Sequence, residues 1–287
     1  METSARPAES GGTQARPVRP VRAVLVCLAK DEDRYMDEWL DYHFKLGFCE
    51  AHVYQNDWQY RGALTGDGRV KLHDVHGRDK QKRTYNDFLH GFAGGDIDFA
   101  AFFDGDEFMC LKPGLRLDGF LANFSDCLGV ALNWKFFGDS GLAAPVGGDY
   151  SVVRRFTRCQ RGFSKTVKTI VNLRRCGAAR FTCDPHSLGV SYRMDCVKSA
   201  NGSAYVRGAS TREAPLEGTQ AAWLNHYFCK TRAEFEDKIR RGRVEWSPRD
   251  GRQRGYYNQR WRWSNRNESE DFTARDFYLG TDAASGR

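Results

Sequence analysis

The first hundred residues alternate between apolar runs and amphipathic segments, and this alternation restricts the fold more than any other feature. Residues 21–29 form a continuous apolar run of the kind found in buried parallel strands. Residues 34–46 repeat apolar side chains at three- and four-residue steps, as a helix does. The other expected elements here are strands at 50–54, 71–75 and 97–103 and a helix at 83–92. Strand–helix–strand units predict an α/β fold, Rossmann-like, with a mostly parallel sheet flanked by helices.

The pattern becomes less regular after about residue 130. Strands are expected at 129–137 and 222–228, whereas residues 142–220 contain short β-like pieces and many glycines. Thr231 and Glu234 have the spacing of a capping box, so a helix should begin there and end near Gly242. The sequence therefore predicts that an irregular, β-rich second half joins the regular βαβ half.

The apolar run at 97–103 ends in Asp104-Gly105-Asp106-Glu107. Open α/β sheets bind ligands outside the carboxyl ends of their strands, so these acids are expected at the ligand edge. Mg²⁺ and Mn²⁺ prefer oxygen ligands, commonly one or two carboxylates together with substrate phosphates. A solvated loop with helix-capping acids remains the alternative interpretation of Asp104 and Asp106.

Composition limits the class of protein. The chain has 40% apolar residues, which is typical of a globular protein, and no apolar run approaches the roughly 20 residues of a membrane span. Residues 1–21 are rich in Pro, Gly, Ser and Arg without an apolar core, and predict a flexible tail rather than a signal peptide. The nine cysteines are scattered and form no Cys-x-x-Cys. We therefore expect a cytoplasmic, reducing location.

The net charge of +7 is concentrated near the C-terminus. Residues 230–266 carry twelve Lys and Arg against five acids, interleaved with aromatic residues such as Trp246, Tyr256 and Trp261. Such a segment can stack on nucleic-acid bases. It can also attract nucleotide phosphates, an anionic glycan or an acidic membrane, or form a solvated face with arginines packed on aromatic rings. We divide the chain into a tail at 1–21, a main domain at 22–243 and a basic aromatic extension at 244–287.

Five blocks of residues follow one another in a recognisable order. They are Lys30-Asp31-Glu32 with Glu38-Trp39 and Tyr42-His43; Leu46-Gly47 with Val53-Tyr54-Gln55-Asn56; Phe102 to Phe108; Asn133 to Gly141; and His226 to Thr231 with Glu234-Phe235 and Lys238. Together the blocks resemble glycosyltransferases of family 92 and related family 2-like members, which have the GT-A fold. The likeness spans about residues 22–243, although Gln55-Asn56-Asp57-Trp58 replaces the family's Asp-Asn-x-Ser and Thr231 stands where Ser is commoner.

The resemblance implies transfer of a sugar from a nucleotide-sugar donor, UDP by default with GDP open, to a glycan or glycoprotein hydroxyl. It implies a Mn²⁺ (or Mg²⁺) ion that stabilises the leaving diphosphate, with Asp104, Asp106 and His226 around it. Other residues assigned to the donor side are Lys30, Glu32, Asn56, Asp57, Arg83 and, as further candidates, Glu107 and Lys165.

The catalytic base is the least defined part of this hypothesis. If the transfer inverts the anomeric carbon, a carboxylate takes the proton of the acceptor hydroxyl. Asp139, in a glycine-flanked turn after a strand, is the candidate, with His186 and Asp184 in reserve; an ordinary turn aspartate has the same sequence signature. His43 lies on the apolar stripe of its helix and is expected in the core. A satisfied strand histidine remains the alternative interpretation of His226.

Two other classes of function compete with glycosyl transfer. A nucleic-acid-binding protein would use the basic aromatic C-terminus and would bind oligonucleotides in a salt-dependent way. A metal-dependent nucleotidyltransferase or phosphohydrolase would use the same carboxylates, but would release pyrophosphate or phosphate in place of a nucleoside diphosphate. The acids at the strand exit favour an enzyme, and the five blocks favour sugar transfer.

Overall fold

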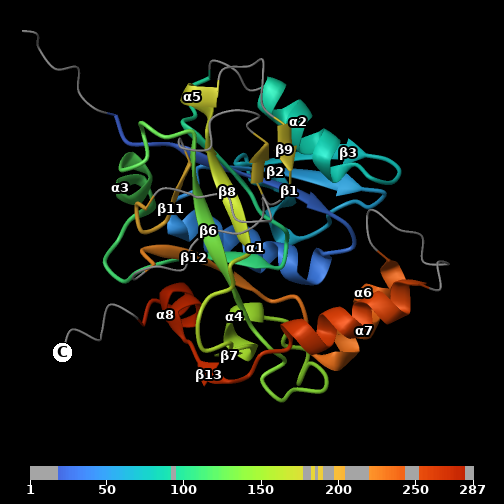
Figure 1. Cartoon of the computed structure of the whole chain (residues 1–287). Coiled ribbons are helices and arrows are strands. Elements are labelled where there is room, and N and C mark those ends of the chain that lie inside the picture. The colour runs from blue at the N-terminus through green and yellow to red at the C-terminus, as the bar shows by residue number, and fades with distance from the viewer. Residues whose placement is uncertain are drawn as a thin grey trace, which may run out of the picture.

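A mixed sheet forms the centre of the molecule, and helices cover both of its faces (Figure 1). The computed structural model describes residues 19–91, 95–176, 182–184, 187–189, 197–203, 220–242 and 252–281. The predicted tail therefore lies almost wholly outside the described residues, as do His186 and Trp246. No helix in the described part of the chain is long and apolar enough to cross a membrane.

The sheet is mostly parallel. Seven of its nine strands run in one direction, and β8 and β5 run in the other. The predicted α/β fold with a mostly parallel sheet is therefore confirmed. In spatial order the strands are β3 (Val70–Val75), β2 (Glu50–Asn56), β1 (Ala23–Ala29), β4 (Phe99–Phe102), β8 (Val167–Asn172), β6 (Gly129–Phe136), β12 (Ala222–His226) and β5 (Glu107–Leu111), with β11 (Val197–Ser199) also paired to β6.

The remaining elements are shorter strands and the helices around the sheet. Two small two-stranded sheets pair β9 (Thr182–Asp184) with β10 (Ser187–Gly189) and β7 (Arg158–Cys159) with β13 (Ser269–Glu270). The helices are α1 (Asp33–Leu46), α2 (Gln81–Gly91), α3 (Leu117–Ala122), α4 (Val152–Arg155), α5 (Leu173–Cys176), α6 (Arg232–Arg241), α7 (Arg252–Ser264) and α8 (Thr273–Leu279), together with a 3₁₀ turn η1 (Ala63–Gly66).

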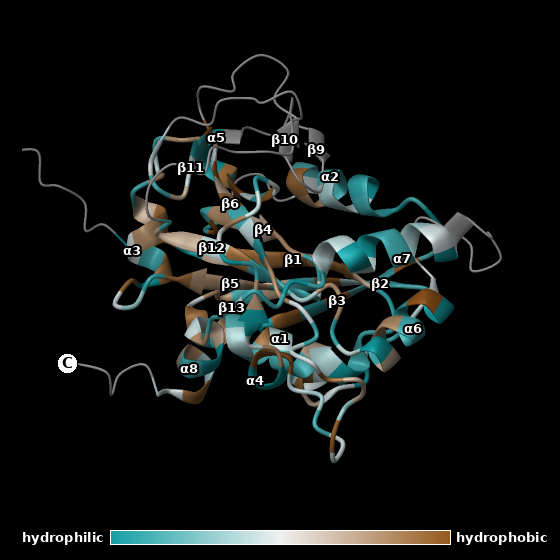
Figure 2. Cartoon of the chain, turned by 60° about the horizontal axis from the view of Figure 1, so that its bottom comes forward, coloured by the Kyte–Doolittle hydropathy of each residue, from teal (hydrophilic) through white to brown (hydrophobic). Residues whose placement is uncertain are grey.

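The core lies on both faces of the sheet. Along β1, Val24 and Val26 face a cluster that includes Tyr85 of α2, and the alternate residues face a larger cluster built with α1. Figure 2 shows α2 on one side of the sheet and α1, α4 and α8 on the other. Because helices cover both faces, every residue of β1 is buried, which explains its continuous apolar sequence.

Helix α1 buries the stripe that its periodicity predicts. Trp39 and Leu40 have no exposed surface, and His43 is equally enclosed. The two ring nitrogens of His43 lie 2.8 Å from the carbonyl oxygen of Trp39 and 3.2 Å from the backbone nitrogen of Met109. The helix ends at Gly47, whose φ of 120° is a conformation that favours glycine. The prediction that His43 belongs to the core is confirmed.

Strand direction brings distant parts of the chain to one edge of the sheet. The parallel strands β1, β4, β6 and β12 end at this edge, and the antiparallel strands β5 and β8 begin there. The residues that follow β1 and β4 therefore lie beside the first residues of β5 and β8. This carboxyl edge is where an open α/β sheet binds its ligands.

The described residues near the C-terminus pack against the main sheet. Asp271 pairs with Lys135 of β6 at 2.6 Å, and both side chains are mostly buried. Gly138 lies so close to this segment that an added Cβ atom would stand 2.6 Å from the carbonyl oxygen of Arg266. Residues 252–281 thus share the core of the rest of the chain, and α7 reaches the carboxyl edge (Figure 1).

Candidate functional site

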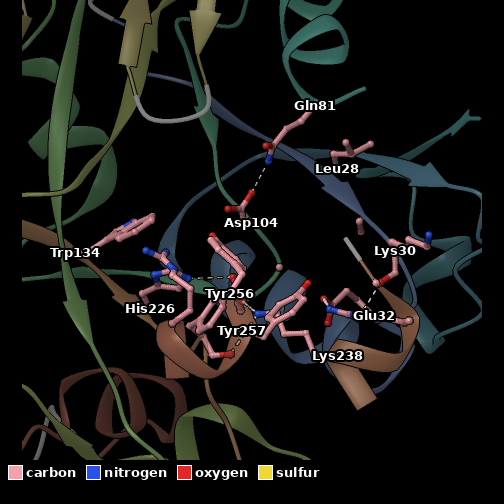
Figure 3. Close-up of a pocket in the computed structure, with 17 residues that line it drawn as sticks. Leu28, Lys30, Glu32, Gln81, Asp104, Trp134, His226, Lys238, Tyr256 and Tyr257 are labelled. Carbon is pink, nitrogen blue, oxygen red and sulfur yellow. Dashed lines mark hydrogen bonds and ion pairs between the residues drawn. The ribbon is translucent and has the colours of Figure 1, made fainter. Parts of the chain in front are cut away.

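A pocket opens at the carboxyl edge, and we call it the edge pocket. Its wall combines residues from the ends of β1, β4 and β12 with residues from α2, α6 and α7 (Figure 3). The residues that line it are Leu28, Ala29, Lys30, Glu32, Gln81, Asp104, Gly105, Asp106, Trp134, His226, Phe228, Lys238, Arg241, Gly242, Tyr256, Tyr257 and Arg260.

Asp104 is the most exposed of the three acids that line the pocket, with about a third of its side chain accessible. Its Oδ1 accepts a hydrogen bond of 2.8 Å from Gln81 Nε2, which Figure 3 shows reaching down from α2. Its Oδ2 lies 2.9 Å from the ammonium of Lys168, a fully buried residue of β8. Burial opposes the charge on Lys168, but Asp104 and Glu107 outweigh it and raise the pKa of the lysine. Asp104 therefore has a fixed carboxylate that can accept hydrogen bonds from a ligand.

Asp106 lies deeper and is held by two basic side chains. Its Oδ2 is 2.6 Å from Lys238 Nζ of α6, and its Oδ1 is 3.5 Å from His226 Nε2 at the end of β12. Burial opposes the charge of Asp106, but Lys238 and His226 overcome it and hold its pKa well below the usual range. The pKa of His226 is itself lowered by burial. Asp106 is therefore an ionised, buried carboxylate at neutral pH.

Glu107 begins β5 and lies beneath the pocket, with no exposed surface. Its Oε2 accepts from the backbone N–H of Asp104 at 2.9 Å and lies 3.3 Å from Lys168 Nζ. Burial raises the pKa of Glu107 well above its usual range, against the attraction of Lys168. Glu107 thus supports the backbone turn that presents Asp104 and Asp106, and its side chain does not line the pocket.

Basic side chains of α6 also line the edge pocket. Arg241, at the end of α6, donates hydrogen bonds to the carbonyl oxygens of Lys30 (2.8 Å) and Asp31 (2.6 Å), and its guanidinium also pairs with Glu32. Lys238 stands one turn earlier on the same helix. The capping box of Thr231 and Glu234, which the sequence predicts, starts this helix and fixes its direction. A ligand in the edge pocket would therefore meet both carboxylates and cations, which are paired with one another.

Several buried polar atoms of the pocket have no hydrogen-bond partner within the described part of the chain. They include Oε2 of Glu32 and Nδ1 of His226, and Oε1 of Glu107, beneath the pocket, also has no partner there. Buried polar groups in native structures are nearly always hydrogen-bonded to protein or water. Unsatisfied atoms gathered around one pocket are consistent with a polar ligand that completes the site.

Helix α7 forms an aromatic side of the pocket. Tyr256 and Tyr257 line it, and Tyr257 is almost fully buried. Trp261 packs on Phe235 of α6, with ring centroids 4.6 Å apart, and Arg232 lies 5.1 Å over the Trp261 ring. These aromatic residues therefore pack on arginines and on neighbouring rings, which is one of the arrangements considered above, while Tyr256 and Trp261 stay half-buried.

The structure brings together five of the residues chosen from the sequence, which are Lys30, Glu32, Asp104, Asp106 and His226. It does not bring Asn56 and Asp57 to the pocket: Asn56 donates to the carbonyl oxygen of Gly77 at 2.9 Å, and Asp57 accepts from the backbone N–H of Gly77 at 3.2 Å. Their contacts are those of turn-forming residues, and a role in nucleotide binding stays a prediction.

Arg83 and Lys165 also lie outside the wall of the edge pocket. Arg83 is exposed on α2 and faces Asp87 at 3.5 Å. Lys165 is exposed just before β8. His186 falls outside the described residues. The donor-binding and reserve roles of these residues therefore stay predictions.

Asp139 is absent from the pocket wall and is held by the segment that follows α7. Its Oδ2 accepts from Asn265 Nδ2 at 2.9 Å, and its Oδ1 accepts from Asn267 Nδ2 at 3.2 Å and from the backbone N–H of Gly141 at 2.9 Å. The Asp139 backbone N–H in turn donates to Asn265 Oδ1 at 2.8 Å. These contacts join two loops. The role of Asp139 as catalytic base stays a prediction.

Sequence reasoning missed the cations that face the two aspartates. Lys168 lies in the apolar run Val167–Asn172, where a lysine is expected to be buried and therefore to need a carboxylate partner. Lys238 and Arg241 have the three-residue spacing of one helical face. These signals indicate paired cations, but only the tertiary packing shows that the partners are Asp104, Asp106 and Glu32.

In the part of the chain that the structure describes, the side chains as arranged do not form a metal site. Among the described residues, no three His, Cys, Asp or Glu side chains are grouped so that they could hold a metal ion. The ammonium nitrogen of Lys168 already lies 2.9 Å from Asp104 Oδ2, and that of Lys238 lies 2.6 Å from Asp106 Oδ2. Ligation of Mn²⁺ by Asp104, Asp106 and His226 stays a prediction, and we derive no step through a metal.

Comparison with known proteins gives distant structural similarity only. No family model and no curated protein matches the sequence. Residues 1–349 of S. aureus TarS in complex with UDP share 13% identity over 53% of this chain and 47% of that chain, with a TM-score of 0.34. This chain thus spans about half the length of that TarS fragment.

Two other solved structures are similar at the same level. Rv0371c from Mycobacterium tuberculosis H37Rv, in complex with manganese, shares 9% identity over 40% of this chain and 66% of that chain, with a TM-score of 0.27. CMP:2-keto-3-deoxy-manno-octonic acid synthetase, in complex with CTP, shares 12% identity over 53% of this chain and 75% of that chain, with a TM-score of 0.30. We draw the function from the geometry of the edge pocket alone.

Proposed function

We propose that this chain is a glycosyltransferase that moves a sugar from a nucleotide-sugar donor to a hydroxyl of a glycan or glycoprotein. The observation that carries the proposal is the mixed lining of the edge pocket, in which the carboxylate of Asp104 shares one opening at the carboxyl edge with the cations Lys238 and Arg241. A sugar offers hydroxyl donors, which suit a carboxylate, and a diphosphate offers anionic oxygens, which suit ammonium and guanidinium groups.

Each part of the donor has a matching part of the pocket. The diphosphate lies beside Lys238 and Arg241, and the sugar hydroxyls donate to Asp104, whose exposed carboxylate is fixed by Lys168 and Gln81. The aromatic residues Tyr256 and Tyr257 flank the same space (Figure 3). The five blocks that resemble family 92 and family 2-like glycosyltransferases include both Asp104 and Lys238, and we take UDP as the first nucleotide to test.

The proposed reaction is a single displacement with inversion. The oxygen of the acceptor hydroxyl forms a bond to the anomeric carbon, and the bond from that carbon to the diphosphate oxygen breaks, leaving its electron pair on the nucleoside diphosphate. The proton of the acceptor passes to a carboxylate. Asp139 is the base predicted from the sequence, and Asp104 is the exposed acid of the pocket.

The test is nucleoside-diphosphate release from a panel of UDP- and GDP-sugars, compared between the wild type and Asp104→Asn. The expected result is release from one sugar nucleotide that falls at least tenfold in the variant, because a pocket carboxylate is lost. Asp126→Asn is the matched control, since Asp126 is 90% exposed and pairs only with Arg175 among the described side chains. Equal nucleoside-diphosphate release by the wild type, Asp104→Asn and Asp126→Asn would mean that the reaction does not use the Asp104 carboxylate of the edge pocket.

The same samples, incubated with nucleoside triphosphates and sugar phosphates, test the competing chemistry. Release of pyrophosphate that depends on Asp104 would replace sugar transfer by nucleotidyl transfer. Parallel reactions with Mn²⁺ and with EDTA test the predicted cofactor.

A further inference from the structure

Lys238 is the best-placed cation of the edge pocket. Its ammonium donates to Asp106 Oδ2 at 2.6 Å and to the carbonyl oxygen of Phe228 at 3.2 Å, and it lies 4.0 Å from the centroid of the Phe228 ring. An ammonium group has three N–H donors, and two are used by these acceptors. About a sixth of the side chain remains accessible. The third donor is therefore available to a ligand in the pocket.

The residues around Lys238 add positive charge and hold the position of α6. The guanidinium of Arg241 donates to Glu32 and to carbonyl oxygens of the loop between β1 and α1. These contacts fix the C-terminal end of α6. Lys230 is almost fully buried, and its ammonium lies 4.2 Å over the ring of Tyr35. Burial lowers the pKa of Lys230. An anion beside Lys238 would relieve this excess of buried positive charge.

The charges of the edge pocket do not favour a site in which a divalent metal ion takes the place of the Lys238 ammonium. The acids that line the edge pocket are Glu32, Asp104 and Asp106, and its cations are Lys30, Lys238, Arg241 and Arg260. The four cations exceed the three acids by one positive charge before any donor binds. The acid that a metal would require, Asp106, already neutralises Lys238 at hydrogen-bond distance.

We propose that the leaving nucleoside diphosphate is stabilised by the ammonium of Lys238, with Lys230 behind it, and that the reaction needs no divalent metal ion. This inference rests on the proposed function. When the bond to the anomeric carbon breaks, the electron pair stays on the terminal diphosphate oxygen, and the third N–H of Lys238 donates to that oxygen. Asp106 holds the ammonium of Lys238 in place through the 2.6 Å hydrogen bond.

The test is calorimetric titration of the wild type with UDP and GDP, in EDTA and in Mn²⁺. We expect one nucleotide to bind in EDTA with a dissociation constant within about threefold of the value in Mn²⁺, which is under 1 kcal/mol. Lys238→Met should weaken this binding by about ten- to hundredfold, the loss of a charge-assisted hydrogen bond. Lys45→Met is the matched control, because Lys45 is half exposed and pairs with Asp41 on α1.

Asp106→Asn separates the two mechanisms further and does not depend on Lys238→Met being folded. If Lys238 holds the diphosphate, this variant should still bind the nucleotide in EDTA, since a negative charge next to the ligand is removed. If a metal holds it, the variant should lose binding in Mn²⁺.

Binding that occurs in Mn²⁺ and disappears in EDTA would overturn the inference and leave the proposed function standing. Retained affinity in a folded Lys238→Met variant would overturn it as well. The absence of nucleotide binding under both conditions, in a protein shown to be folded by circular dichroism, would overturn the proposed function and this inference together.

Discussion

The ammonium of Lys168 lies 2.9 Å from Asp104 Oδ2, although the lysine side chain has no exposed surface. The lysine enters from β8, which runs antiparallel to β4 and therefore begins where β4 ends. A second carboxylate, that of Glu107, lies 3.3 Å away. The Asp-Gly-Asp-Glu segment is thus held from beneath by one buried cation.

Replacing Lys168 by methionine should destabilise the fold. The substitution keeps much of the side-chain volume but leaves Glu107 and the inner oxygen of Asp104 without their cation. Breaking a buried ion pair in this way costs about 3–5 kcal/mol. Urea unfolding measures the change, with Lys112→Met as a control because Lys112 is exposed. A Lys168→Met protein that unfolds at the wild-type urea concentration would show that this pair does not support the turn.

The sequence predicts those parts of the fold in which local pattern and burial agree. The run that becomes β1 is apolar throughout because both of its faces are covered, and α1 has a clear stripe because it packs on one face of the sheet. Strand β5 was not predicted, since Glu107–Leu111 follows β4 after only a short turn and lies beside β12, more than a hundred residues later. Pairing at such sequence distance leaves no local signal.

The sequence likewise predicts those residues of the site that have a local signal, but not their partners from distant elements. Acids at the exit of an apolar strand indicate a ligand edge, and Asp104 and Asp106 do line the pocket. Their partners Lys168 and Lys238 come from β8 and α6, and pairing them requires the order of strands in the sheet. The glycine-flanked turn indicates Asp139 as a candidate base. The residues that bind its carboxylate, Asn265 and Asn267, follow it by more than a hundred residues, so the local sequence does not predict these contacts.

His43 should make stability depend on pH. Burial lowers its pKa to about 3, below the value of about 6.5 expected in the unfolded chain. Between these values the unfolded state binds more protons, so the contribution of His43 is complete above pH 6.5 and is lost as the pH falls toward 3. Between pH 7.5 and 4.5 we expect His43 alone to remove about 2–3 kcal/mol of unfolding free energy.

Urea unfolding at several pH values, compared between the wild type and His43→Gln, measures this contribution. The variant should be less stable at pH 7.5 but should lose less stability on acidification. His76→Gln is the control, because the side chain of His76 is 81% exposed. Identical pH dependence in the wild type and His43→Gln would mean that His43 is not held neutral in the core.

Gly138 should be intolerant of a side chain. An added Cβ would lie 2.4 Å from Asn267 Oδ1 and 2.6 Å from the carbonyl oxygen of Arg266, so the segment after α7 must move. Forcing extra atoms into a packed contact costs about 1–3 kcal/mol, and Gly138→Ala should lower the melting temperature accordingly. Gly119→Ala is the control, since nothing lies within 4 Å of its added Cβ. An equal melting temperature for both variants would contradict the close packing of this segment.

The catalytic base can be decided by separating the charge of Asp139 from its structural contacts. Asp139→Asn removes the charge and places an amide against Asn265, whereas Asn265→Ala breaks the same contact and keeps the carboxylate. If Asp139 is the base, Asp139→Asn should lower turnover by about 10²–10⁴ with nucleotide binding unchanged, and Asn265→Ala should lower it far less. If the two variants lose similar turnover and similar stability, Asp139 only joins the loops. The proton would then pass to Asp104, and Asp104→Asn should show the larger loss of turnover.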